Sequence, residues 1–318
     1  RLGEDTRVEL RGGAGRFSLD SGSTLDQFAT DGTPVRQIRI STVLEDTSWS
    51  LAGKLMHNLG SGHNLVGGWE LEGANRLETS GTWFDGQLQE GAAGTDVTAR
   101  TLRQAVYLQD EWDPSRDWSA YAGLRVEQIR SRSDSGDTPV DNRSTVVSPL
   151  AHLVWRFDAP KRDQLRLSLT QSYRAPTLRN LVALPMLSTL YPVTGVNFSS
   201  SPDRAGNPNL KPEQSHGIDI ALERYLGNGG VLSASLFHRR IRDLIRNVTE
   251  EETVPWSNFR RYVSRPRNLG KATVEGVEFD AKFRLTELKP DAPPLDLRMN
   301  LSLFRSRVES VPGPDNRI

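Results

Sequence analysis

The sequence of 318 residues contains no cysteine, which excludes disulfides, thiolate metal sites and a cysteine nucleophile. It also has no excess charge of either sign, because 40 basic and 40 acidic residues cancel, and this balance gives no support for a nucleic-acid partner. Only 36% of the residues are hydrophobic. No apolar run is as long as the ~18–20 residues of a transmembrane helix, although transmembrane β-strands need only about 9–11 residues.

Helical periodicity is scarce, and alternation of apolar and polar residues replaces it. In SWSLAGKL, Trp49, Leu51 and Leu55 share one face, and in GVEFDAKF, Val277 and Phe279 do the same. The same alternation recurs at residues 105–112, 150–157, 165–170, 218–223, 232–237 and 295–303. A period of two predicts β-strands, about eleven or twelve in total, and hence an all-β fold. RVELRGG and RFSLDSG could form one broken strand or a hairpin, and residues 34–46 could run directly into the strand at Trp49.

The links between these strands alternate in length. The short links are LGSGHN, WDPSRDW, FDAPKRDQL, LGNGGV and LKPDAPPL, and the longer ones span residues 72–100, 130–145, 175–213 and 247–263. In an up-and-down meander, alternate links lie at opposite ends of the strands. All short turns then lie at one end and all long loops at the other, which is the layout of an outer-membrane β-barrel. The strands of a soluble β-sandwich or lectin also alternate apolar and polar residues. Such a fold, however, gives no reason for short and long links to alternate along the chain.

Aromatic residues give weaker support for a barrel. We expect several of them at or near strand ends, where they would form the girdles at the two membrane interfaces. These residues are Trp49, Trp112, Trp118, Trp155 and Phe157. Soluble β-proteins also use Trp at the ends of their cores, so this observation alone does not separate the two classes.

Four motif blocks occur in a fixed order in the second half of the chain. They are SYRAP at 172–176, NPNLKPE at 207–213, IRDLI at 241–245, and NLGKA at 268–272 followed by GVE at 276–278. In order and spacing they resemble the barrel region of TonB-dependent outer-membrane receptors. QDEW at 109–112 and YAGLRVE at 121–127 resemble earlier strands of the same family. The resemblance covers at least residues 47–305.

The local chemistry of these blocks agrees with the resemblance. Pro176 removes a backbone donor where a strand leaves the sheet, and Pro208 and Pro212 keep the returning segment extended. Glu213 then begins the next strand. Gly276, in the middle of a strand, predicts a bulge or the close approach of another backbone, which the resemblance would assign to a plug domain.

The resemblance implies a transmembrane antiparallel barrel of 22 strands around a plugged lumen. The strands predicted here make up about half of it, so we interpret residues 1–318 as a partial barrel without a separate second domain. We expect no plug domain, energy-coupling box or terminal aromatic strand in this sequence, and therefore a fragment or an incomplete receptor. Alternation predicts that Leu167 and Leu301 face lipid, and that Arg166 and Arg298 face the interior.

The resemblance also implies a function: energy-coupled import of a scarce ligand, most commonly a ferric siderophore. Haem, cobalamin, other metal chelates and oligosaccharides remain open. The implied partners are the TonB inner-membrane complex, acting through the plug, and outer-membrane lipid with lipopolysaccharide. No resident cofactor is implied. The alternatives are another outer-membrane barrel, either porin-like or a barrel hydrolase, and a soluble β-rich binding module.

No catalytic constellation is present in the sequence. None of the five histidines belongs to a metal-binding or acid–base motif, and we expect no enzyme. The candidate ligand-binding residues are arginines and aromatics on or near the longest loop, because guanidinium groups bind anionic oxygens and aromatic rings suit planar chelators. They are Arg166, Arg174, Arg179, Tyr191, Phe198 and Arg204. The alternative role for these arginines is solvation or contact with lipopolysaccharide phosphate.

Overall fold

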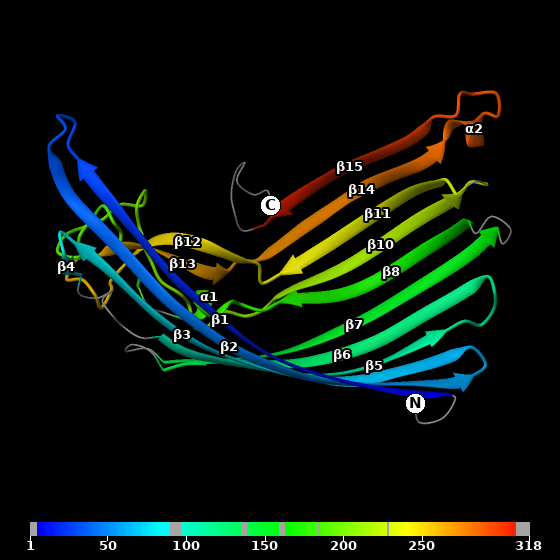
Figure 1. The fold of residues 1–318 in the computed structure, drawn as a ribbon, viewed down its shortest axis with the longest axis horizontal. Helices are drawn as coiled ribbons and strands as arrows, with labels where there is room; N and C mark the ends of the chain where they lie inside the picture. The colour runs from blue at the N-terminus through cyan, green and yellow to red at the C-terminus, as the bar shows by residue number, and fades with distance from the viewer. Residues whose placement is uncertain are drawn as a thin grey trace.

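The computed structural model describes residues 5–89, 97–134, 139–158, 163–182, 185–227 and 229–309. Its main feature is one curved antiparallel sheet whose strand order follows the chain (Figure 1). In spatial order the strands are β1 (Thr6–Phe28), β2 (Pro34–Gly60), β3 (His63–Phe84), β5 (Val97–Trp112), β6 (Trp118–Ser133), β7 (Val140–Asp158), β8 (Asp163–Arg174), β10 (Glu213–Tyr225), β11 (Val231–Arg242), β14 (Lys271–Arg284) and β15 (Asp296–Val308). The short β4 (Gln87–Leu88) pairs with β3.

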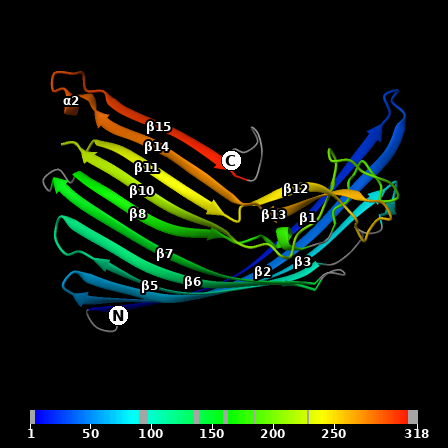
Figure 2. The same cartoon turned by 180° about the vertical axis from the view of Figure 1, so that it is seen from behind.

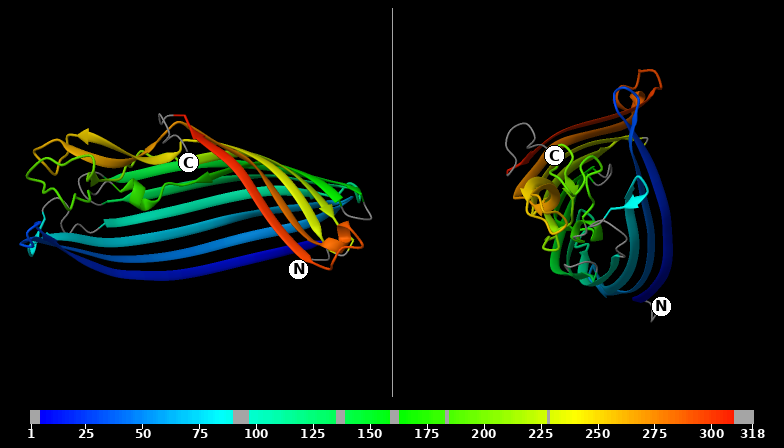
Figure 3. Two further views of the ribbon diagram at one scale, coloured as in Figure 1. Left: turned by 90° about the horizontal axis from the view of Figure 1, so that it is seen from above. Right: turned by 90° about the vertical axis from the view of Figure 1, so that its left-hand side faces the viewer.

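The sheet curves into a trough and does not close on itself within the described residues, where β1 and β15 form its two edges (Figure 3). The predicted all-β, up-and-down, partial barrel is therefore confirmed. Short helices are rare: α1 (Leu178–Leu181) follows β8, and α2 (Leu285–Leu288) follows β14. In the described part of the chain, no helix has the length and apolarity to cross a membrane.

The N-terminal region forms one continuous strand, not a hairpin. β1 pairs with β2 along its length, with one irregularity near Phe28, and β2 itself continues past Trp49 to Gly60. A broken β1 and the hairpin alternative are therefore wrong. The glycines of RVELRGG are tolerated because neighbouring β2 supplies partners for every part of the strand.

The two faces of the sheet differ in chemistry, as alternation predicts. Leu167 lies opposite Leu153 and Ile220 on the convex face, and Leu301 lies opposite Phe279. These positions belong to a band of exposed apolar side chains, of which Leu301 is 51% exposed. Such a surface in water would be costly, but in lipid it is the expected outer face of a barrel.

The long connections lie together at one end of the sheet, and the turns after β2, β5, β7, β10 and β14 lie at the other, as predicted (Figures 1 and 2). The short turn between β1 and β2, residues 29–33, is an exception, because it lies at the end with the long connections. The links themselves differ in detail. β3 continues to Phe84, so the link after Glu72 is shorter than predicted. The link 247–263 contains most of a hairpin, β12 (Ile245–Glu252) with β13 (Arg261–Asn268). The turn predicted between Phe157 and Leu165 includes residues 159–162, which lie outside the described residues.

The segment between β8 and β10 is long but has structure of its own. It contains α1 and β9 (Asp203–Arg204), and β9 pairs in parallel with β13. Together β12, β13 and β9 form a second, three-stranded sheet. Seen along the trough, this segment lies on the concave side of the main sheet (Figure 3, right).

Gly276 lies in a region of unbroken pairing between β11, β14 and β15, so the predicted bulge is wrong. The predicted close approach is present, but the neighbours belong to this sheet. A Cβ on Gly276 would lie 2.6 Å from the carbonyl oxygen of Leu303 and 2.9 Å from the ring of Phe237. Glycine is required here because these cross-strand neighbours fill the space that a side chain would take.

The aromatic girdle is present at the end with the short turns. Trp118 stacks on Trp155 with ring centroids 5.7 Å apart, and Trp155 contacts Phe157 at 5.6 Å. Trp112 closes β5 at the same end. Trp49 is the exception to the prediction, because it lies in the middle of β2.

Candidate functional site: the inner wall and its loop

The concave face encloses a hollow of about 920 Å³ beneath the long loop. Its walls come from β1, β2, β3, β5 and β6, and the end of β8 with the first residues after it closes one side. Arg103, Glu127 and Tyr173 contribute charged and polar groups, whereas Pro176 and Leu178 bring the start of the loop to the rim. A polar interior of this kind is the wall of an aqueous or plugged lumen.

A network of alternating charges covers this wall. Arg103 lies directly opposite Glu72 in the register of β3 and β5, and its guanidinium donates to the Glu72 carboxylate at 2.5 Å. Arg125 on β6 donates to Glu70 and to Glu127, each at 2.6 Å. Because these residues alternate along three neighbouring strands, their side chains meet on one face.

Tyr173 joins the end of β8 to this network. Its hydroxyl donates to the carboxylate of Glu127, which is buried, with 3% of its side chain exposed. Two polar atoms in this region, Nε of Arg103 and the hydroxyl of Ser133, are buried without a hydrogen-bond partner among the described residues. Buried polar groups are nearly always paired, so these two atoms are exceptions within the described residues.

The sequence motifs meet where the strands leave the sheet. The Glu213 carboxylate accepts hydrogen bonds from the Ile245 amide at 2.6 Å and from Arg174 at 3.0 Å. Asn268 donates to the carbonyl oxygens of Lys211 and Asp243 at 2.9 and 2.8 Å. The side chains that carry the family resemblance therefore hold the loop and hairpin in place at the mouth.

The turn from β11 into β12 uses a left-handed residue. Asp243 has φ of 54°, a conformation that Asp and Asn tolerate better than most side chains.

α1 begins after Thr177, whose hydroxyl accepts a hydrogen bond from the Asn180 amide at 3.3 Å. The buried side chain of Leu181 then packs with Leu210 and Ile245. These contacts return the loop to the mouth of the trough.

A buried ion pair organises the outer part of the loop. Asp203 on β9 and Arg261 on β13 are both fully buried, and Arg261 binds both carboxylate oxygens at 2.9 and 2.8 Å. Arg261 also donates to the carbonyl oxygens of Tyr191, Pro192 and Gly195. One guanidinium therefore fixes three loop carbonyls and the carboxylate that follows them.

The carboxylate of Asp203 is satisfied from several sides. It accepts from the Ser188 amide at 2.9 Å and from the Trp256 indole at 3.0 Å. Burial by itself would raise the pKa of Asp203, but the hydrogen bonds from Arg261, Ser188 and Trp256 outweigh it and hold this pKa below its ordinary value. The pair is thus kept ionised in the interior of the loop.

The structure brings some of the predicted ligand-binding residues together. Tyr191 and Phe198 contact each other edge to face at 5.2 Å, and the Phe198 side chain is 53% exposed. Arg204 is exposed on β9, with its backbone bridged to Met186. The Arg179 guanidinium lies 3.6 Å from the Met186 sulfur. These residues belong to the same loop.

The remaining two predicted residues lie elsewhere. Arg174 sits at the rim, where it lines the hollow and pairs with Glu213. The prediction that Arg166 lies on or near the loop is wrong. Arg166 is close to the other end of β8, where it pairs with Glu223 at 2.7 Å. Its position in the chain predicts a place on or near the loop, but strand β8 carries it to the opposite end.

Several residues of this site were not predicted as candidates. Arg103 and Glu127 on the wall carry a signal in the sequence, because each is a charged residue in a segment where polar and apolar residues alternate, and Tyr173 belongs to the SYRAP block. Asp203 and Arg261 carry none, because only the fold pairs them. Among the described residues, no group of three or more His, Asp or Glu side chains could hold a metal ion.

Comparison with known proteins points to outer-membrane receptors. The family model described as TonB dependent receptor-like, beta-barrel, matches residues 3–317. The iron-regulated outer membrane virulence protein of Vibrio cholerae serotype O1 is 23% identical over 205 residues, which cover 62% of this chain and 28% of that protein.

Two solved structures illustrate the similarity of fold. The ferric-catecholate import receptor Fiu of E. coli K12 has a TM-score of 0.63 and 15% identity, covering 97% of this chain and 46% of that one. The ferripyoverdine receptor of Pseudomonas aeruginosa, bound to ferripyoverdine, has a TM-score of 0.61 and 16% identity, covering 98% and 39%. The chain thus spans less than half the length of these proteins, and at such identities the likeness shows the fold.

Proposed function

Because this chain belongs to the TonB-dependent receptor family, as part of its β-barrel in the bacterial outer membrane, we propose that it serves the energy-dependent import of a ferric siderophore. The observation that carries this proposal is the concave site: a charged inner wall below an ordered loop that presents aromatic and cationic side chains. The family is one of receptors rather than enzymes, and the soluble and porin-like alternatives do not fit it.

The chemistry of the mouth supports an anionic metal chelate as the ligand. Phe198 offers an exposed ring next to Tyr191, and Arg204 and Arg179 offer exposed guanidinium groups in the same loop. Aromatic faces stack on planar chelating groups, and guanidinium groups bind carboxylate or catecholate oxygens in a bidentate manner. The names of similar proteins point to iron: one is iron-regulated, and another imports a ferric catecholate.

The inner wall supports passage of a polar ligand after release from the mouth. The buried Nε of Arg103 has no partner among the residues that the structure describes, and Glu127 and Tyr173 lie on the same wall. We propose that this part of the wall contacts the plug of the whole receptor, and that the TonB complex moves the plug at the expense of the proton gradient. Haem, cobalamin, other metal chelates and oligosaccharides remain the alternative ligands.

Binding by the purified receptor tests the choice of ligand. Ferric hydroxamate, ferric catecholate, ferric citrate, haem, cobalamin and a maltooligosaccharide would be titrated, with tryptophan fluorescence as the signal. We expect one ferric complex to bind, and Phe198→Ser to weaken it about tenfold or more, as truncation of an aromatic anchor does. Phe259→Ser is the matched control, because Phe259 is 45% exposed but lies outside this loop. Binding of a non-iron ligand alone would contradict the proposal.

Uptake by cells tests the energy coupling separately. Radiolabelled iron, supplied as the complex that binds, should accumulate in cells that carry the receptor and stop when a protonophore collapses the gradient. A passive porin would continue to admit the complex under these conditions. Uptake that persists with the protonophore would therefore refute import through a TonB-coupled receptor.

A further inference from the structure

The first strands extend well beyond the others at the end with the long loops (Figure 1). A transmembrane β-strand needs only about 9–11 residues, and a span of that length, counted back along β2 from Gly60, ends near Trp49. The rest of β2, residues 34–48, covers about 50 Å at roughly 3.3 Å per residue. We call residues 15–28 of β1, 34–48 of β2 and 74–84 of β3 the outer extension.

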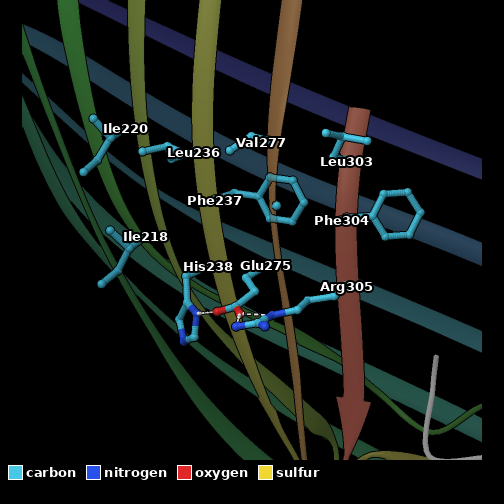
Figure 4. Close-up of a pocket in the computed structure, with 11 residues that line it drawn as sticks. Ile218, Ile220, Leu236, Phe237, His238, Glu275, Val277, Leu303, Phe304 and Arg305 are labelled. Carbon is cyan, nitrogen blue, oxygen red and sulfur yellow. Dashed lines mark hydrogen bonds and ion pairs between the residues drawn. The ribbon is translucent and has the colours of Figure 1, made fainter. Parts of the chain in front are cut away.

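In the part of the sheet between Trp49 and the short turns, apolar side chains lie on the convex face. Ile220, Leu236 and Val277 show this arrangement, because they line an apolar hollow on that face (Figure 4). On β2, Leu51 and Leu55 are exposed in the same way. This is the face that meets lipid in an outer-membrane barrel.

In the outer extension the apolar side chains change to the concave face. Gly15 and Ser48 lie opposite each other and line the concave hollow described above. Alternate residues of a strand share a face, so the next concave residues of β1 are Phe17 and Leu19, and Leu19 lies opposite Leu44. Over the same stretch the convex residues of β1 are polar or glycine: Arg16, Ser18, Asp20, Gly22, Thr24 and Asp26.

The change of face follows from the surroundings expected beyond the membrane. There the convex face meets water, and the concave face borders the space above the mouth together with the long loop (Figure 3). Phe17 is 55% exposed and Leu19 is 44% exposed, so the described residues leave both partly uncovered. Neighbouring apolar side chains that stay exposed mark a surface for an apolar partner.

We propose that the concave face of the outer extension binds an aliphatic chain of the imported ligand, which makes the substrate an amphiphilic ferric chelate with an acyl tail. This assignment rests on the import of a ferric chelate proposed above. The apolar face continues from the candidate site, because the hollow lined by Gly15 and Ser48 is closed on another side by Arg174 and Pro176 at the start of the long loop. The tail lies along the extension while the loop holds the chelate.

The charges beside Phe17 favour an uncharged occupant. Asp46 lies opposite Phe17, and Arg76 donates to both Asp46 carboxylate oxygens at 2.8 and 2.6 Å. This bidentate pair is neutral as a whole, so this part of the face attracts neither an anion nor a cation. A protein partner would need about 800 Å² of surface on each side, which a row of three apolar side chains does not provide. A narrow acyl chain matches the row.

A pair of ligands that differ only in the tail tests this assignment. The full receptor, held in amphipol so that no micelle takes up the chain, would be titrated with the ferric chelate that it binds and with the decanoyl derivative of that chelate. We expect the derivative to bind about tenfold or more tightly, because apolar surface is buried. Phe17→Ser/Leu19→Ser should remove this advantage and leave binding of the unacylated chelate unchanged.

The matched control is Val43→Ser/Leu77→Ser. It removes two apolar side chains, each 42% exposed, from the convex face of the same extension, where Val43 lies opposite Asp20 and Leu77 lies opposite Glu45. The control should keep the full advantage of the decanoyl derivative. Equal affinity for the two ligands, or the same response of the two double variants, would overturn the proposal.

Crosslinking to the unmodified receptor does not depend on the variants being assembled. A diazirine at the end of the acyl chain should label residues 15–25 of β1 or 40–46 of β2, as mapped by peptide mass spectrometry. Labels confined to other segments would mean that another part of the receptor covers this face, and they would also overturn the proposal. Equal binding of both ligands leaves the import of a ferric chelate intact, whereas binding of neither contradicts the import function itself.

Discussion

At the scale of single residues, the pair of Arg261 and Asp203 has the most to explain. Both side chains are fully buried, and removing two charges from water costs several kcal/mol per ion unless hydrogen bonds replace the lost hydration. Here the replacement is extensive: Arg261 donates to Asp203 and to three loop carbonyls, and Asp203 accepts from Ser188 and Trp256. We therefore infer that the main effect of the pair is to fix one conformation of the loop, and that its net contribution to the free energy of unfolding is smaller.

Arg261→Leu should release the loop between α1 and β10. It leaves the Asp203 carboxylate buried without its cation, and loss of one partner from a buried pair costs about 3–5 kcal/mol. Hydrogen exchange at residues 185–212 should rise accordingly, while exchange in β5 and β6 stays unchanged. Arg260→Leu is the control, because Arg260 and Glu251 form an exposed pair worth about 0–1 kcal/mol. Equal protection in the two variants would show that the pair does not hold the loop.

At the scale of elements, each strand is defined by the difference between its two faces. β8 shows this most simply, since Leu167 lies between Leu153 and Ile220 on the convex face and Arg166 pairs with Glu223 on the concave face. The strand cannot slip by one residue, because every apolar side chain would then turn into the lumen and every charge into lipid.

Leu167→Arg should therefore impair assembly, whereas Arg166→Leu should be tolerated. An arginine at the middle of the lipid face costs about 2–4 kcal/mol, while Arg166 loses only a half-exposed ion pair worth about 0–1 kcal/mol. The amount of receptor assembled in outer membranes, and the urea midpoint of its unfolding in detergent, would measure the difference. Similar behaviour of the two variants would mean that the faces are assigned wrongly.

At the scale of the whole molecule, the two ends of the sheet are chemically distinct. One end carries the short turns and the contacts among Trp118, Trp155 and Phe157. The other carries the long loops and, on the convex face, Arg242, Lys271 and Arg307. In outer-membrane barrels the short turns face the periplasm and the longer loops face outward, so we expect the same orientation here.

Single cysteines can report this orientation without interference, because the sequence has none of its own. In intact cells, a membrane-impermeant maleimide should label Ser200→Cys, which lies exposed in the long loop. It should label Ser115→Cys, exposed in the turn between β5 and β6, only after the outer membrane is permeabilised. The reverse pattern of labelling would place the loop and its ligand site on the periplasmic side.

The sequence by itself determined the class of fold, because strand alternation and the parity of link lengths are local properties that survive without any contact information. It also determined the family, since the four motif blocks lie in order. The structure gives these blocks a physical role. Glu213 and Asn268 bind the backbone of segments that are distant in the chain. Their side chains are therefore needed at the point where these segments leave the sheet together.

The tertiary structure alone decided which residues meet. Asp203 and Arg261 are separated in the chain by β10, β11 and β12, and nothing in their local sequence predicts that they pair. Arg166 was assigned to the loop by its proximity in sequence, although a strand extends by about 3.3 Å per residue and carries it to the opposite end. That Arg242, Lys271 and Arg307 lie near one another on the convex face likewise follows only from the register of β11, β14 and β15. Periodicity fixes the face of a residue within a strand, but only pairing between strands fixes its neighbours.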